Sequence, residues 1–153
     1  FDRNGVRTPM QWNAGVNAGF SSSPSDKLYA PLIDDNHNGY KAVNVAVEEN
    51  DPGSQLSFIR KLISTRKRSP ALVNGSFTWV QPGVNPPVAA YLRVSPEQTV
   101  LALHNLSEKS QPFAMSLPRN GTVKDLLSGE AIAADGVLRL TLAPLEFRWL
   151  ELP

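Results

Sequence analysis

The sequence predicts a mainly β protein, in which a C-terminal antiparallel β-sandwich is preceded by a long loop and one helix. Three observations support this. From about residue 75 onward, short segments of β type alternate with turn signals. Between residues 51 and 70 one apolar stripe has helical spacing, and residues 1–50 show little periodicity. We expect the second half to bury its own core and the first half not to.

Residues 1–50 are rich in Asn, Gly, Ser, Pro and Asp, and their apolar residues are scattered. A stretch of this length without regular structure is uncommon in a compact domain unless it is a linker or a functional loop. A flexible linker seldom contains large aromatic residues such as Trp12, Phe20 and Tyr29. We therefore expect an ordered loop that lies on something larger.

The next segment predicts a helix. Asp51 is a suitable N-cap, Pro52 suits the first helical position, and Pro70 ends the pattern. Basic residues fall in the last turns, where cations oppose the negative end of the helix dipole. The apolar stripe consists of Leu56, Phe58, Ile59, Leu62 and Ile63.

Seven strands are expected after the helix. Their predicted ranges are 75–81, 88–95, 98–106, 111–117, 122–127, 137–142 and 145–152. The turn signals between them are Pro82-Gly83, Ser95-Pro96, Asn120-Gly121, Ser128-Gly129 and Asp135-Gly136. Strands of this number and spacing are typical of a small antiparallel sandwich.

Composition excludes several classes of function. The chain has 153 residues, 41% hydrophobic and 19% charged, with a formal net charge of +1. This balance does not favour nucleic acid, membranes or acidic partners. The absence of cysteine excludes disulfides and thiolate chemistry, and it fits a cytoplasmic location. No apolar run approaches the ~20 residues of a membrane span. We expect no cofactor.

One run of residues has a specific resemblance. Arg7-Thr8-Pro9-Met10-Gln11-Trp12, followed by Asn17-Ala18-Gly19-Phe20-Ser21, resembles the loop after the eighth barrel strand in the α-glucosidase and trehalose synthase branch of family 13 glycoside hydrolases. The preceding Asp2-Arg3-Asn4-Gly5-Val6 is also similar, although many members of that family have Asp where this chain has Asn4.

The resemblance covers nearly the whole chain. Segments 27–33 and 40–45 look more like trehalose synthases than oligo-1,6-glucosidases. Segment 56–72 resembles the last barrel helix and the start of the C-terminal domain, and segments 103–107 and 149–152 resemble the family's C-terminal β-sandwich. The resemblance implies that residues 1–72 are the tail of a (β/α)8 catalytic barrel and residues 73–153 a C-terminal domain. The chain, which begins with Phe1 rather than Met, is then expected to be the C-terminal part of a longer enzyme.

Catalysis in this family requires carboxyl groups that the chain does not supply. A retaining glycosidase needs two carboxyl groups about 5–5.5 Å apart. The resemblance implies that the catalytic acids come from earlier barrel strands, upstream of Phe1. Glu48-Glu49 and Asp34-Asp35 are adjacent pairs, whose side chains diverge, and we interpret all four as solvated loop acids. We therefore assign no catalytic residue and expect the isolated chain to be inactive.

Arg7 is the one residue that we assign to a substrate site, and only in the complete enzyme. The resemblance implies that it lies at the closed end of the glucose pocket, where it pairs with an aspartate from an earlier loop and reaches sugar hydroxyls. A guanidinium suits this role because its fixed fork of donors meets a carboxylate and hydroxyls together. The alternative is that Arg7 only ties the loop to the barrel rim.

The remaining candidates have structural interpretations. Trp12 and Phe20 are either sugar-stacking platforms or, as we favour, anchors of the loop on the barrel. His37 and His104 have no partner at metal-ligand spacing, so no metal site is expected, and His104 is predicted to be packed on a strand. The apolar helix stripe predicts that the isolated chain either self-associates through residues 1–70 or leaves part of them poorly ordered.

Two classes of function remain open. In the first, the parent enzyme interconverts maltose and trehalose through a covalent glucosyl intermediate, or it is an α-glucosidase or oligo-1,6-glucosidase. In the second, the chain is a non-catalytic module that binds carbohydrate or another partner. For the second class, a carbohydrate-binding module normally displays several aromatic residues on one sheet face, but here they are spread over several predicted strands: Trp79, Tyr91, Phe113, Phe147 and Trp149. Phe147 and Trp149 are two residues apart and would share a face, which a core stripe would equally do.

Overall fold

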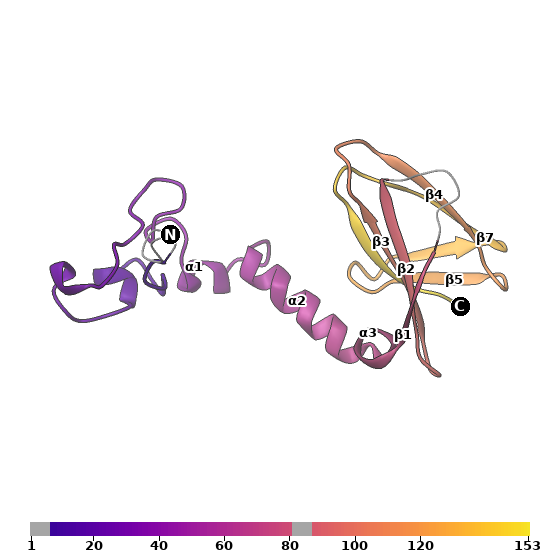
Figure 1. Ribbon diagram of the computed structural model, residues 1–153, viewed down its shortest axis with the longest axis horizontal. Helices are drawn as coiled ribbons and strands as arrows, with labels where there is room; N and C mark the ends of the chain where they lie inside the picture. The colour runs from indigo at the N-terminus through magenta and orange to yellow at the C-terminus, as the bar shows by residue number, and fades with distance from the viewer. Residues whose placement is uncertain (1–6, 81–86) are drawn as a thin grey trace. The chain divides into compact units, whose positions relative to one another are not determined.

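The computed structural model describes residues 7–80 and 87–153 (Figure 1). The expectations for Asn4 and for the turn at Pro82-Gly83 therefore fall outside the described residues. The chain divides into two compact units, Phe1–Arg60 and Lys61–Pro153, which we call the N-terminal unit and the C-terminal unit. Each is described by itself.

The N-terminal unit consists mainly of loops and turns. Its described residues form two short 3-10 helices, η2 (Val16–Gly19) and η3 (Ser25–Lys27), and the short helix α1 (Val45–Glu49). The side chain of Asn44 caps α1, because its Oδ1 accepts the N–H of Val47 at 3.0 Å. Few apolar side chains are buried here, and Ala18 and Ala30 are the buried hydrophobic residues among residues 7–60.

Helix α2 (Gln55–Arg68) begins later than the sequence predicts. The prediction that Asp51 and Pro52 start it is wrong, because Asp51 instead closes a turn by accepting the N–H of Gly53 at 2.8 Å. Ser54 takes the capping position, with its Oγ accepting the N–H of Ser57 at 3.1 Å. At the other end, Pro70 stops α2 as predicted and starts α3 (Pro70–Asn74). The described chain thus has three α-helices, not one.

The apolar stripe of α2 is largely exposed. Ile59 is 42% exposed and Ile63 50%, and the one buried residue of this helix is Thr65. An amphipathic helix normally buries its apolar side against a neighbour. The helix therefore carries an apolar face that the described residues leave open to solvent.

Outside residues 81–86, the C-terminal unit contains eight strands in two antiparallel sheets, which confirms a mainly β fold with a C-terminal sandwich (Figure 1). The larger sheet has the order β1-β2-β3-β8-β5-β6, and the smaller one pairs β4 with β7. The strands are β1 (Ser76–Trp79), β2 (Val88–Val94), β3 (Thr99–Asn105), β4 (Gln111–Ser116), β5 (Gly121–Asp125), β6 (Ala131–Ala134), β7 (Val137–Leu142) and β8 (Phe147–Glu151).

The sequence predicts seven of these strands and misses β6. This strand reads Ala-Ile-Ala-Ala, and alanine is depleted in strands, so β propensity gives it no signal. It forms because its backbone pairs with β5 from Gly121↔Ala134 to Lys124↔Ala131. Tertiary pairing here overrides local preference.

One apolar core lies between the two sheets. The larger sheet contributes fully buried residues such as Leu101, Leu103 and Leu150, and the smaller sheet contributes Leu138 and Leu142. Burial of a leucine side chain contributes about 1.5–3 kcal/mol, so this cluster can hold the sandwich together. The expectation that the second half buries its own core is confirmed.

Candidate functional site

Arg7 is the first residue that the structure describes, and its side chain is exposed. Among residues 7–80 and 87–153, no carboxylate forms an ion pair with its guanidinium. Its role at a sugar remains a prediction.

The residues that follow Arg7 are fixed by Gln11. Its side-chain amide Nε2 donates to the carbonyl oxygens of Val43 at 2.6 Å and Asn38 at 3.1 Å. The backbone continues the connection, because the N–H of Val45 donates to the Gln11 carbonyl at 3.0 Å. The motif from Arg7 to Trp12 is thereby pinned to the start of α1, about thirty residues away in sequence.

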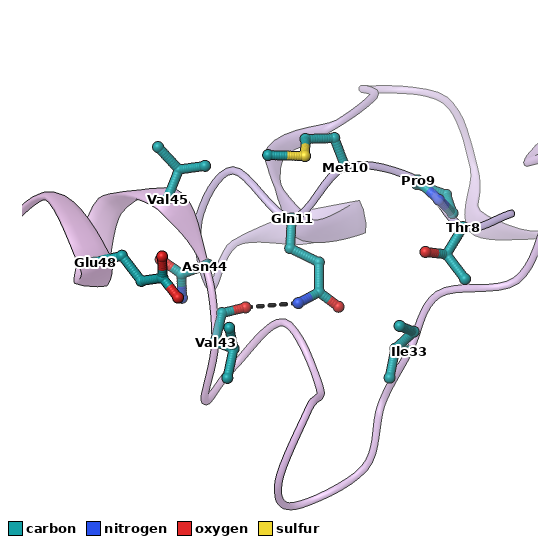
Figure 2. A pocket seen from close by; sticks show the side chains of 9 residues that line it. All are labelled: Thr8, Pro9, Met10, Gln11, Ile33, Val43, Asn44, Val45 and Glu48. Atoms are coloured by element: carbon teal, nitrogen blue, oxygen red, sulfur yellow. Dashed lines mark hydrogen bonds between the residues drawn. The ribbon is translucent and has the colours of Figure 1, made fainter. Parts of the chain in front are cut away.

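A pocket of about 370 Å³ opens beside this connection. Figure 2 shows Gln11 at its centre, with Val43 on one side and Thr8 and Ile33 on the other. The Oε1 of Gln11 is buried and accepts no hydrogen bond from the described residues. A buried acceptor without a donor is unfavourable by about 1–3 kcal/mol. The pocket lining is Thr8, Pro9, Met10, Gln11, Ile33, Val43, Asn44, Val45 and Glu48.

The Asn-Ala-Gly-Phe part of the motif forms a left-handed turn. Asn17, Ala18 and Gly19 have φ values of 51°, 59° and 69°. Glycine adopts this conformation freely, but alanine does so at an energetic cost. The turn is held because the carbonyl of Ala18 accepts the N–H groups of Trp12 at 2.8 Å and Asn13 at 3.1 Å.

The side chain of Asn17 completes this turn from inside. It is only 3% exposed. Its Nδ2 donates to the carbonyls of Ser21 at 2.9 Å and Ser23 at 2.6 Å, while its Oδ1 accepts the hydroxyl of Ser25 at 2.7 Å. One amide thus orders the loop from the motif to η3. Sequence reasoning noted the motif but missed this function of Asn17, which the Asn-Ala-Gly turn signal could have indicated.

The acidic pairs prove to have structural contacts. The interpretation of Glu48 and Glu49 as loop acids is wrong, because both lie in α1. Glu48 accepts the N–H of Leu56 at 3.1 Å and so helps to cap α2. Glu49 forms an ion pair with Arg60 at 2.7 Å. These two carboxylates therefore connect α1 to α2.

Asp34 and Asp35 are solvated acids of a turn, as predicted. Asp34 pairs with Lys41 at 3.2 Å. Asp35 accepts the backbone N–H groups of Asn38 and His37, and these bonds lower its pKa because they stabilise the ionised form. The lowered pKa of Asp35 is the opposite of the raised pKa that a catalytic acid in this type of reaction needs.

The two aromatic candidates of the loop are partly exposed in this unit. Trp12 is 49% exposed and Phe20 43%. This exposure leaves both interpretations open, sugar stacking and anchoring on a barrel.

The two histidines differ in their exposure and packing. His37 is on the exposed turn. His104 is packed on β3 between the rings of Tyr91 and Phe147, at centroid distances of 5.7 and 5.8 Å, which confirms its predicted packing. Burial lowers the pKa of His104 because it disfavours the imidazolium. In the two described stretches, no group of three or more His, Asp or Glu side chains is arranged to hold a metal ion.

None of the helices in the described residues has both the length and the apolar composition to cross a bilayer. The loop presents an exposed guanidinium, a left-handed turn and a pocket with an unpaired acceptor. Such a loop can bind and position a ligand. The carboxylates of both acidic pairs, however, already form hydrogen bonds or ion pairs with other residues of the chain.

Comparison with known proteins agrees with the geometry. Residues 1–75 match the family described as alpha amylase, catalytic domain, and residues 77–149 match the maltogenic amylase C-terminal domain. A trehalose synthase/amylase from Mycobacterium tuberculosis is 38% identical over 99% of this chain and 26% of its own length. An oligo-1,6-glucosidase from Parageobacillus thermoglucosidasius is 30% identical over 95% of this chain and 25% of its own length.

Solved structures give the same assignment. The trehalulose synthase MutB from Pseudomonas mesoacidophila MX-45 superimposes with a TM-score of 0.68 at 34% identity, covering 98% of this chain and 26% of MutB. The chain spans about a quarter of the length of these relatives. It belongs to the α-amylase superfamily, family 13 of the glycoside hydrolases, and combines sequence of the catalytic domain with sequence of the C-terminal domain.

Proposed function

We propose that this chain is the C-terminal part of an α-glucoside-acting enzyme that interconverts maltose and trehalose by retaining glucosyl transfer, and that the chain alone is not catalytic. The observation that carries the proposal is the 36–38% identity to trehalose synthases over almost the whole chain. The proposed domain boundary lies between residues 72 and 73, with the catalytic barrel before it. The proposed location is the cytoplasm.

Arg7 is the proposed substrate-binding residue of the complete enzyme. Arg7 lies at the start of the loop segment that the side-chain hydrogen bonds of Gln11 and Asn17 order. An arginine fork on a rigid loop is suited to pairing with a carboxylate while donating to sugar hydroxyls. The transfer reaction also needs a pocket that keeps water from the glucosyl intermediate, and a rigid loop at the rim serves that need.

A second candidate function is hydrolysis by an α-glucosidase or oligo-1,6-glucosidase. A probable oligo-1,6-glucosidase from Bacillus subtilis is 38% identical over 72% of this chain, which supports this alternative. The two activities share the covalent intermediate and differ in the acceptor, which is glucose in one and water in the other.

The products formed from maltose by the full-length enzyme distinguish these candidates. Formation of trehalose supports the transferase, whereas glucose as the single product supports the hydrolase. The 153-residue chain assayed in parallel is expected to convert no maltose, and turnover by contaminant-free chain would refute the proposal.

The role of Arg7 is tested by the full-length variants Arg7→Lys and Arg7→Ala. Because a misplaced substrate can slow an enzyme about 10²-fold, we expect a loss of that order in kcat/KM for both variants. Lys41→Ala, which removes an exposed cation of the same unit, is the matched control and should retain activity. If Arg7→Lys is as active as the control, Arg7 only ties the loop in place.

A further inference from the structure

Glycine directly follows an asparagine or an aspartate at several places in this chain. In such a pair the main-chain nitrogen of the glycine can attack the side-chain carboxyl or amide carbon of the residue before it, and no Cβ obstructs the approach. The pairs are Asn4-Gly5, Asn38-Gly39, Asn74-Gly75, Asn120-Gly121 and Asp135-Gly136. The first of them lies outside the described residues, so the comparison concerns the other four.

The reaction at an Asp-Gly pair rearranges the main chain without a net change of atoms. A bond forms between the glycine nitrogen and the aspartate Cγ, a carboxyl C–O bond breaks, and water leaves to give a five-membered succinimide. Water then opens the ring. Where the bond from nitrogen to the main-chain carbonyl carbon breaks, the product is isoaspartate, whose main chain runs through Cγ and is longer by one methylene. At an Asn-Gly pair ammonia leaves in the first step instead of water.

The attack requires a glycine nitrogen that is free to lose its proton and to approach the side-chain carbon. Two of the Asn-Gly pairs do not meet this requirement. The N–H of Gly39 donates to the Asp35 carbonyl at 3.1 Å, and the N–H of Gly75 donates to the Ala71 carbonyl at 3.0 Å. The same two carbonyl oxygens lie so close to these glycines that not even a Cβ would fit beside them. Both nitrogens are therefore held in place.

The pair Asn120-Gly121 is held by the larger sheet. Gly121 is the first residue of β5 and lies opposite Ala134 of β6. In the same ladder Asp125 donates its N–H to the Glu130 carbonyl at 2.8 Å. Hydrogen-bonded and non-hydrogen-bonded pairs alternate along an antiparallel ladder. Gly121, four residues before Asp125, is therefore in a pair of the hydrogen-bonded type, and its nitrogen is not free.

The pair Asp135-Gly136 differs from the other three. Asp135 is exposed, and the two residues connect β6 to β7. The Gly136 carbonyl accepts the N–H of Leu117 at 2.8 Å, but the N–H of Gly136 donates to no acceptor among residues 7–80 and 87–153. Its φ of 66° is a conformation that glycine adopts readily.

The space around Gly136 also leaves the nitrogen accessible. A Cβ built on this glycine would have the Asn120 Oδ1 as its nearest neighbour at 3.5 Å, which is an ordinary van der Waals distance. The attacking nitrogen and the side-chain carboxyl that it needs thus lie together in one exposed, uncrowded turn.

We propose that the Asp135-Gly136 turn is the site at which this chain converts itself to isoaspartate, and that the conversion destabilises the sandwich. The inference uses only the main-chain geometry of this chain and does not rest on the proposed function. The turn passes from the larger sheet to the smaller one, between Ala134, which is 6% exposed, and Leu138, which is fully buried. An additional methylene in the main chain between them disturbs the packing of both.

Peptide mapping of the aged 153-residue chain tests the proposal. Samples are incubated at physiological temperature in mildly acidic and in mildly alkaline buffer, and isoaspartate is located by fragmentation mass spectrometry. We expect it to accumulate at Asp135 severalfold above every other described Asp or Asn. It should form faster in the acidic buffer, because the neutral carboxyl is the electrophile. Absence of isoaspartate at Asp135, or faster formation at Asn38, Asn74 or Asn120, would overturn the proposal.

Asp26 is an internal control for exposure alone. Its side chain is 73% exposed, but Lys27 follows it, and the N–H of Lys27 donates to the Pro24 carbonyl at 2.9 Å. We expect no isoaspartate at Asp26. Formation there at the rate seen at Asp135 would show that exposure decides the site and would contradict the role of the free glycine nitrogen.

Two substitutions at the site sharpen the test. Asp135→Glu keeps the charge but requires a six-membered ring, which closes far more slowly, so no rearrangement is expected. Asp135→Asn replaces the water that leaves by ammonia and so makes the first step visible as a change of mass. This substituted residue should lose ammonia severalfold faster than Asn38, Asn74 and Asn120 of the same chain. Equal rates would contradict the protection of those three.

The effect on stability is measured on the same samples. The Tm of the aged chain should fall as the isoaspartate fraction rises, and the Tm of Asp135→Glu aged in parallel should stay constant. A chain that is largely isomerised at Asp135 with an unchanged Tm would contradict the destabilising effect. An equal loss of Tm in Asp135→Glu would assign the loss to another site and contradict it as well.

Discussion

The two units of this chain are ordered by different forces. The C-terminal unit has a closed apolar core in which five leucines are fully buried. In the N-terminal unit, order comes from hydrogen bonds of Gln11, Asn17, Asp35 and Asn44, and its large apolar side chains remain substantially exposed. The C-terminal unit is therefore stabilised by its own apolar core. The N-terminal unit has a defined loop conformation but leaves large apolar side chains exposed.

The largest effect is expected in the sandwich core. Leu101→Ala should destabilise the C-terminal unit by about 3 kcal/mol, because a fully buried leucine leaves a cavity behind. Val16→Ala in the N-terminal unit, where the side chain is 76% exposed, is the control and should change stability by less than about 0.5 kcal/mol. Denaturant unfolding followed by circular dichroism measures both, and similar values would remove the distinction between the units.

The second effect concerns the left-handed turn. Asn17→Ala removes three hydrogen bonds from a buried amide, and we expect a loss of about 2 kcal/mol in the local stability of residues 12–25. Hydrogen exchange of the amides in this segment is the measurement, and protection in β3 should be unaffected. Asn13→Ala, which removes one exposed contact to Gly15, should have a smaller effect.

The helix stripe gives a third test. Because Ile59 and Ile63 are exposed, we expect the chain to self-associate, and the double substitution Ile59→Ser and Ile63→Ser should shift it toward the monomer. Sedimentation velocity over a range of concentrations is the measurement, with Lys61→Ser on the same helix as the control. A chain that is monomeric at every concentration before substitution would contradict the expected association.

The smallest effect is a pH dependence of the C-terminal unit. Burial holds the pKa of His104 below its ordinary value of 6.5, so the folded state favours the neutral imidazole. The stability that this contributes is fully present above pH 6.5 and is lost as the pH falls through the folded-state pKa. His104→Gln should flatten the dependence of unfolding free energy on pH between about 7.5 and 5.5, whereas His37→Gln on the exposed turn should not.

The sequence predicted most strands of the sandwich because strands such as β7 alternate apolar and polar residues and lie between turn signals. Leu138 and Leu142 in β7 are buried as that alternation requires. Strand β6 was not predicted because its alanines have no preference for β structure. The predicted start of α2 was wrong because an aspartate such as Asp51 is equally suited to a turn and to a helix N-cap.

The candidate site was less accessible to sequence reasoning. Arg7 and its motif could be identified from the resemblance, but the bonds of Gln11 to Val43 and of Asn17 to Ser23 depend on loop geometry that no periodicity encodes. The row of ring contacts that runs across the larger sheet from Trp79 to Trp149 was missed for a related reason. Its rings are neighbours across strands, and strand order cannot be read from spacing along the chain.

Native-state hydrogen exchange of the 153-residue chain tests most directly whether the two units are ordered by different forces. The account predicts that amides of β2, β3 and β8 exchange only by global opening of the sandwich, while amides of residues 7–50 exchange through local openings of much lower free energy. Protection of residues 7–50 equal to that of β3 would show that the N-terminal unit is complete by itself and would contradict the account.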